Sequence, residues 1–200
     1  MKEEFVELEK ILIKNGFNVN TFNNISEAKT ELLFQIKVEE SIGIGGSMTI
    51  KDMDIYDDLK DKGNEVYWHW KNEVPNAAVK AINTDTYITS TNALTMDGKL
   101  VNMDGNGNRV SSMIFGHKDV YIIVGKNKIC KDYDAAIKRI REVASPLNAK
   151  RLNLNTPCVH TGICSDCDSP ERICRAEVII HKNPNGTNIN IYLVDEELGY

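Results

Sequence analysis

The sequence lacks the patterns that mark membrane and nucleic-acid-binding proteins. No apolar stretch approaches the roughly 18 to 20 residues of a membrane-spanning helix, and the Glu-rich start "MKEEFVELEKILIKNGF" lacks the apolar run of a signal peptide. Basic residues form no run interleaved with aromatics, and the net charge of −5 disfavours a general affinity for nucleic acid or anionic membranes. We therefore expect a cytoplasmic protein that binds neither.

Familiar catalytic motifs are missing as well. The chain contains no G-x-S-x-G nucleophile turn, no H-E-x-x-H zinc motif and no glycine loop followed by Lys-Ser or Lys-Thr. It has no internal repeat or low-complexity segment, and its 200 residues, 42% apolar and 26% charged, suit one ordinary globular domain. The residues alone therefore leave open whether the protein is an enzyme.

Helical and strand patterns alternate along the chain. We expect helices near 1–14, 26–36, 48–59, 75–83, 108–115 and from 131 to just before Pro146. Strands are expected near 41–44, 65–70, 85–91, 119–125, 176–182 and 188–194. A hairpin over 92–105 turns at Asp97-Gly98. This alternation predicts one α/β domain over 1–200, with a mostly parallel sheet flanked by helices, a Cys-rich excursion at about 150–175 and a C-terminal strand pair.

A glycine turn lies where the strand at 41–44 leads into the next helix. In "IGIGGSMTI", Gly43, Gly45 and Gly46 permit a positive φ and leave no Cβ between the backbone and a bound group, while Ser47 and Thr49 supply hydroxyls. Free amides at the start of the helix favour an anion. We expect Gly45, Gly46, Ser47 and Thr49 to bind an anion or another ligand; the alternative is a plain tight turn.

A second glycine turn, "MDGNGNRVSSMIFG", follows the hairpin. Its glycines let the backbone approach a ligand, its carboxylate and amides can hold hydroxyls, and its arginine can grip an anion through two parallel hydrogen bonds. The candidate ligand-binding residues are Asn102, Asp104, Gly105, Gly107, Asn108 and Arg109. Because both turns follow strands, they can face one cleft. The alternative is an ordinary Asn/Gly-rich turn with a solvated arginine.

Four of the five cysteines crowd into residues 158–174. Cys158, Cys164, Cys167 and Cys174 have the spacing C-x5-C-x2-C-x6-C, whose central C-x2-C is a common chelating arrangement. In a reducing compartment such crowding favours metal or redox chemistry over disulfides. The cysteines predict a zinc site or an iron–sulfur cluster, the alternative being reduced thiols in a loop.

Several segments together resemble the short stand-alone proteins of the lactate-utilization (LUD) domain family, which are related to lactate-utilization protein C. They are "GIGGSMTI", "TSTNALTMDGKLVNMDGNGNRVSSMIFG", "VYIIVGKNKI" and "TPCVHTGICSDCDSPERIC". The resemblance runs from about residue 5 to 198, and residues 87–128 carry most of it. It implies a fold of the NagB/RpiA/CoA-transferase type and a tendency to self-associate.

The same resemblance implies a role in lactate or organic-acid utilization. The protein would bind a small anionic metabolite, and it would work with other lactate-utilization subunits in an iron–sulfur electron-transfer complex. One alternative is an enzyme acting on a sugar phosphate or CoA ester, in which Asp97 and Asp104 are the positions open to an acid/base role. The other is a non-catalytic regulatory subunit stabilised by zinc.

Overall fold

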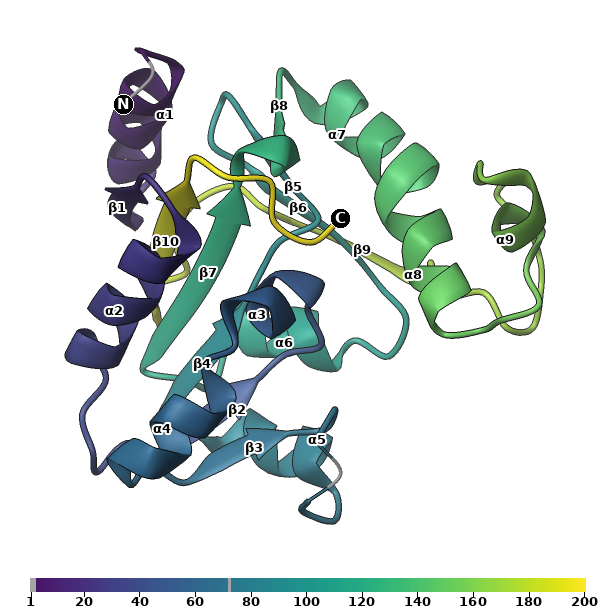
Figure 1. The fold of residues 1–200 in the computed structure, drawn as a ribbon. Helices are drawn as coiled ribbons and strands as arrows, with labels where there is room; N and C mark the ends of the chain where they lie inside the picture. Colours follow the sequence, from purple (N-terminus) through teal and green to yellow (C-terminus); the bar gives the residue numbers. More distant parts are fainter. Residues whose placement is uncertain (1–2, 72) are drawn as a thin grey trace.

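The computed structural model describes residues 3–71 and 73–200, and within this part of the chain the strands form a six-stranded and a four-stranded sheet (Figure 1). The larger sheet has the order β1 (Asn18–Phe22), β10 (Asn188–Val194), β7 (Asp119–Gly125), β4 (Thr86–Thr89), β2 (Ile42–Ile44) and β3 (Val66–Trp68). Its neighbouring strands are all parallel. The smaller sheet has the order β8 (Ile129–Cys130), β5 (Ala93–Thr95), β6 (Leu100–Asp104) and β9 (Ala176–Ile180).

The described α-helices after α1 lie between these strands in the sequence, so the expected α/β fold with a mostly parallel central sheet is confirmed. They are α1 (Glu3–Lys14), α2 (Ile25–Gln35), α3 (Met48–Met53), α4 (Tyr56–Lys62), α5 (Ala77–Lys80), α6 (Asn108–Ile114), α7 (Tyr133–Arg139), α8 (Ser145–Arg151) and α9 (Pro157–Thr161). The first two positions of the helix expected over 1–14 lie outside the described residues. None of the described helices is long and apolar enough to cross a bilayer.

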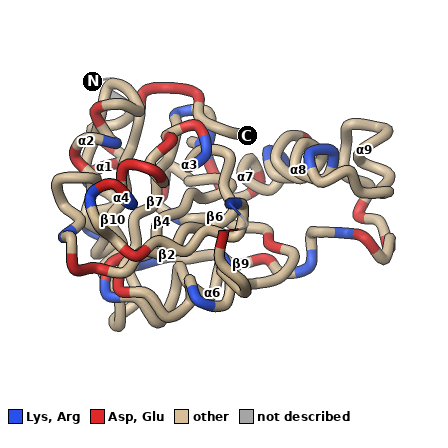
Figure 2. The backbone as a smooth tube through the Cα atoms, turned by 60° about the horizontal axis from the view of Figure 1, so that its bottom comes forward, with Lys and Arg blue, Asp and Glu red and all other residues tan. Residues whose placement is uncertain are grey.

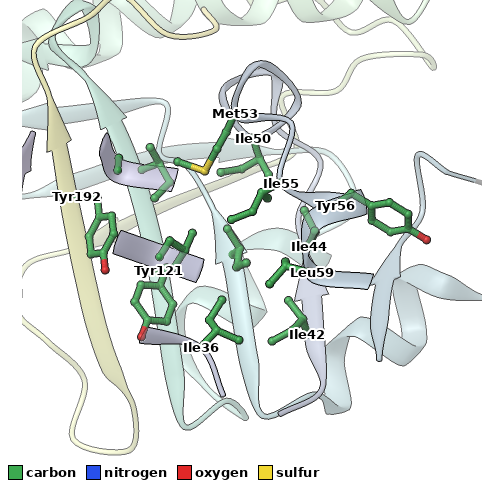
Figure 3. Packing of buried hydrophobic residues seen from close by; sticks show 14 of the residues in the cluster. Ile36, Ile42, Ile44, Ile50, Met53, Ile55, Tyr56, Leu59, Tyr121 and Tyr192 are labelled. Carbon is green, nitrogen blue, oxygen red and sulfur yellow. The ribbon is translucent and has the colours of Figure 1, made fainter. Parts of the chain in front are cut away.

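One face of the larger sheet is covered by α2, α3 and α4. Figure 3 shows Ile50 and Leu59 from these helices packed over the strands, with Tyr121 of β7 and Tyr192 of β10 on the same side. Ile122 and Leu193 point to the opposite face and are fully buried there. β7 and β10 therefore present apolar side chains on both faces, as the strands of a parallel sheet buried on two faces do.

The opposite face of the larger sheet packs against α1, α6 and the smaller sheet (Figure 1). Leu8 of α1, Met113 of α6 and Leu100 of β6 are fully buried in this layer. The far side of the smaller sheet is covered in turn by α7 and the turn after it, through Ala136 and Ile140. The smaller sheet thus holds α7 and α8 beside the larger one.

The order of the strands creates a crevice at the carboxyl ends of β2 and β4. From β2 the chain crosses to β3 at one edge, and then returns to form β4 on the other side of β2. The chain segments that follow β2 and β4 lead away from each other at this point, so they leave the carboxyl ends of these two strands uncovered. Ligands of parallel α/β sheets bind at this kind of position.

The helix expected to end before Pro146 does not end there. The chain passes from α7 through a wide π-helical turn at 140–144 into α8, which continues to Arg151. Within a regular helix the proline ring would clash with the carbonyl four residues earlier, and the wide turn relieves this clash. The added length places α8 beside the crevice.

Two further expectations need correction. The helix expected over 48–59 is interrupted at Asp54, whose φ of 51° closes α3 before α4 begins. The two C-terminal strands both form, but they do not pair with each other: β9 joins the smaller sheet, whereas β10 lies between β1 and β7 in the larger one.

We expect Gly43→Ala to destabilise the fold. Gly43 lies in β2, which pairs with β4. A Cβ on Gly43 would lie 2.5 Å from the backbone oxygen of Ala81. Because backbone cannot move away as a side chain can, the substitution should lower the free energy of unfolding in urea by about 1–3 kcal/mol.

The matched control for this change is Gly186→Ala, since a Cβ there has its nearest neighbour, the Phe115 ring, at 4.0 Å. Equal losses in the two variants would contradict the packing assigned to Gly43.

Candidate functional site

A cavity of about 230 Å³ lies at the carboxyl ends of β2, β3 and β4. The residues that follow these strands line one side of it, and the second glycine turn, α8 and the C-terminal residue line the others. Its polar lining includes Ser47, His69, Ser90, Asn92, Asp104, Asn106, Asn108, Arg109, Lys128, Ser145, Asn148, Arg151 and Tyr200. The cavity therefore occupies the crevice that the strand order creates.

Both glycine turns reach this cavity, although they come from different sheets. Gly46 and Ser47 line it after β2 of the larger sheet. Asp104, Gly105, Asn108 and Arg109 line it after β6 of the smaller sheet. The other candidate ligand-binding residues, Gly45, Thr49, Asn102 and Gly107, are not part of its lining as described.

The first turn needs its glycines for space and not for a positive φ. None of the three has a left-handed φ, which corrects the conformational reason expected from the sequence. A Cβ on Gly45 would lie 2.7 Å from Thr89 Oγ1, so this glycine allows β2 and β4 to pack closely. Ser47 accepts a hydrogen bond from the Ile50 amide at 3.4 Å and caps α3, which brings its hydroxyl to the cavity wall.

The second turn is shaped by Asp104. Its Oδ1 accepts hydrogen bonds from the amides of Asn106 (3.0 Å) and Gly107 (2.7 Å). Gly107 has a φ of 82°, a left-handed conformation that a residue with a Cβ rarely adopts. The Asp104 carboxylate is thus engaged in holding the turn.

Arg109 is buried behind the second turn, with 8% of its surface exposed. Its Nη1 donates to Ser90 O and Asn102 Oδ1, its Nη2 donates to Asn92 Oδ1 and Met103 O, and its Nε lies 3.3 Å from Asp104 Oδ2. These contacts occupy all five N–H groups of the guanidinium. Arg109 therefore joins the turn to the segment after β4, and it has no donor left for the two-bond grip on an anion expected from the sequence.

Lys128 is the cation that sequence reasoning missed. It lies in a short 3-10 turn after β7, is 3% exposed, and donates from Nζ to Thr49 Oγ1 (2.7 Å) and Ser90 Oγ (2.9 Å). Among the described residues no carboxylate lies within ion-pair distance of its ammonium. Burial, with the charges of Arg139 and Arg109, lowers the pKa of Lys128 to about 7.

The outer wall of the cavity combines aromatic and basic side chains. The Arg151 guanidinium lies 4.4 Å from the centre of the Trp70 ring, and its Nε donates to Tyr200 Oη at 2.9 Å. Burial, followed by the nearby charge of Arg151, lowers the pKa of His69. Figure 2 shows basic residues along α8, the helix that carries Arg151. The charge on this side of the cavity is therefore positive.

The hairpin carboxylate Asp97 lies away from the cavity. It accepts a hydrogen bond from Thr95 and pairs with Lys99, and its backbone oxygen accepts from Asn15 Nδ2 at 3.4 Å. These contacts place it against α1, at the opposite end of β5 and β6 from the second turn. The structure thus brings Asp104 to the cavity and leaves Asp97 outside it.

The four clustered cysteines lie on the other side of α8, where they line a second, small cavity of about 20 Å³. All four are free thiols, and all are half-buried. Within the described residues no three His, Cys, Asp or Glu side chains are close enough together to hold a metal ion. The four cysteines therefore lie around one cavity, but the described residues do not hold three of these ligand types close enough together for a metal ion.

Comparisons with known proteins point to one family. The sequence model of the LUD domain matches residues 6–194. A crystal structure of a DUF162 family protein from Deinococcus radiodurans is similar in fold, with a TM-score of 0.58, 10% sequence identity and 96% of each chain covered. No curated protein matches the sequence.

We expect Arg109→Ala to destabilise the protein strongly. The change would leave the Asp104 carboxylate without its ion-pair partner, and Asn92 and Asn102 without the guanidinium that donates hydrogen bonds to them. Removing one partner of a buried ion pair costs about 3–5 kcal/mol, so urea unfolding should shift to markedly lower denaturant.

Arg151→Ala serves as the control, because this arginine is exposed and contacts the same cavity from outside. Its loss should cost less than about 1 kcal/mol. A small effect of Arg109→Ala would show that the network does not hold the second turn.

Proposed function

The chain belongs to the LUD domain family, and we propose that its cavity binds a small organic anion, a 2-hydroxy acid of the lactate class, used in organic-acid metabolism. Membership of the family supports a lactate-utilization-related function at the level of the family. The identity of the ligand rests on the chemistry of the cavity.

The observation that carries this proposal is the buried ammonium of Lys128. Its hydrogen-bond partners Thr49 and Ser90 are neutral hydroxyls, and the carboxylate of Asp52, which raises its pKa, makes no hydrogen bond or ion pair with it. An ammonium removed from water is costly unless an opposite charge accompanies it. A carboxylate in the cavity would supply that charge and keep the Lys128 side chain fully protonated.

The size and lining of the cavity favour a small acid with a hydroxyl group. Its volume of about 230 Å³ is below the roughly 300–1,000 Å³ of pockets for drug-sized ligands, which favours a three- or four-carbon acid over an enclosed CoA ester. Ser47 and Ser90 can hydrogen-bond a carboxylate or hydroxyl, and His69, which lies beside Gly46, can hydrogen-bond the same hydroxyl.

A second candidate function is catalysis on the same acid, with Lys128 as the group that exchanges a proton. The observation that favours it is the combination of the cavity position of Lys128 and its pKa of about 7, since a general base works best with a pKa near the ambient pH. Asp104 is less suited to this role because its oxygens are held by the turn and by Arg109.

We expect Lys128→Met to weaken the binding of L-lactate about 100-fold or more, because the carboxylate would lose its buried counter-charge. Isothermal titration calorimetry against L-lactate measures this directly, with phosphate titrated in parallel. The fold should be retained, since methionine can fill the apolar volume of the lysine stem.

Lys126→Met is the matched control. Lys126 leaves the same strand only two residues earlier, but it pairs with Asp195 at 3.1 Å and does not line the cavity as described. Its affinity for lactate should equal that of the unchanged protein. Equal affinity in Lys128→Met would remove the basis of the proposed function.

We also expect affinity to depend on pH. In the empty cavity Lys128 loses its proton near pH 7, whereas a bound carboxylate raises its pKa, so that binding above pH 7 takes up a proton. Affinity should be constant below about pH 6 and fall about tenfold per pH unit above about pH 8, up to the pKa of the complex. Calorimetry across this range checks the slope; a flat profile would contradict the assignment to Lys128.

A further inference from the structure

The four cysteines from 158 to 174 are brought together around one hollow. Cys158, Cys164, Cys167 and Cys174 all line the cavity of about 20 Å³, together with Arg172 and a few small or apolar residues. The segment that carries them lies with α9 at the outer edge of the molecule (Figure 1). The fold therefore brings the thiols of one loop to a common hollow.

The backbone around the central pair is shaped to direct hydrogen bonds at sulfur. Asp166, between Cys164 and Cys167, has a φ of 50°, and its amide donates to Cys164 Sγ at 3.4 Å. The Cys164 amide in turn donates to the carbonyl of Arg141 at 3.0 Å, which fixes the loop to the long helical segment beside it. Amides that point at sulfur stabilise the thiolate form, which is the form that binds metal.

Arg172 adds both rigidity and charge. Its guanidinium donates to the carbonyls of Cys167 (2.6 Å) and Cys174 (3.0 Å) and to Asp166 Oδ1 (3.0 Å). One side chain thus ties three points of the loop together while it lines the hollow. A fixed positive charge there offsets the negative charge of several thiolates around a metal group.

Four thiolates can bind a single zinc ion or an iron–sulfur cluster, and the spacing of the thiols favours the cluster. A single tetrahedral zinc, with Zn–S bonds of about 2.3 Å, needs its sulfurs to meet around one point. Here the thiols border a cavity instead, and the described residues contain no three ligands that close to one another. We propose that Cys158, Cys164, Cys167 and Cys174 bind a [4Fe–4S] cluster, which takes one cysteine on each iron.

The position of the proposed cluster suits electron transfer, a role that differs from anion binding. Ile173 lines both the cysteine cavity and the larger cavity, so one residue forms a wall common to the two. The cluster would lie beside the ligand site and near the outer surface, where a one-electron carrier can meet a protein partner. The cluster itself requires only the four cysteines and does not depend on which anion the larger cavity takes.

The test is metal analysis of the full-length protein purified without oxygen and reconstituted with ferric iron, dithiothreitol and sulfide, in which the thiol reduces half of the iron to the ferrous state. We expect about four irons and four acid-labile sulfides per chain, with visible absorption that bleaches when dithionite is added. Cys167→Ala should lose most of the iron and the absorption. Cys130→Ser should keep both, because Cys130 is buried against Ala136 and Ile140 and lies outside the hollow.

Each of the other outcomes would overturn the proposal. One zinc per chain without sulfide would identify a structural ion site, and no retained metal after reconstitution would leave the thiols unligated. A cluster that survives Cys167→Ala would have other ligands. Lactate titrations of Cys167→Ala, with circular dichroism as a check on folding, keep this result separate from the anion site: loss of iron with unchanged lactate affinity affects only the cluster.

Discussion

The buried charge of Lys128 is the constraint on which this account of the protein depends. The ammonium is 3% exposed, is held by the hydroxyls of Thr49 and Ser90, and faces a cavity instead of a carboxylate. The fold brings these three residues together because β2, β4 and β7 run parallel and end at the same edge of the sheet. We propose that this cation, which forms no ion pair with a carboxylate among the described residues, makes the cavity selective for anions.

The second glycine turn contributes to the cavity mainly as a fixed wall. Asp104 holds the backbone of the turn, and Arg109 binds it to Asn92 and to the residues after β4. Two sheets that share no hydrogen-bonded strand are thereby joined at the one place where a ligand would lie. On the other side of α8, Arg172 performs a similar task for the cysteine loop, so each cavity has its own buried or half-buried arginine as a brace.

The sequence alone was enough to predict the helices and strands with a clear apolar pattern and the positions of the two glycine turns. Alternating apolar residues predicted β7 and β10, and the glycines and hydroxyls of the first turn pointed to the segment whose Gly46 and Ser47 line the cavity. It could not distinguish Lys126 from Lys128, because a short 3-10 turn decides which of them points inward and the partner Thr49 is distant in sequence. The hydrogen bonds of Arg109 could not be read from the sequence for the same reason: its acceptors come from two segments, residues 90–92 and 102–104. The polar edge strand β1 offered no apolar pattern to detect.

The most direct test of the central claim is the titration of the Lys128 ammonium itself, followed by NMR in protein with labelled lysine side chains and assigned by comparison with Lys128→Met. We expect a midpoint near pH 7 without ligand and a shift to higher pH when L-lactate is added. A midpoint near 10.4, the ordinary value for lysine, that lactate leaves unmoved would contradict the central claim.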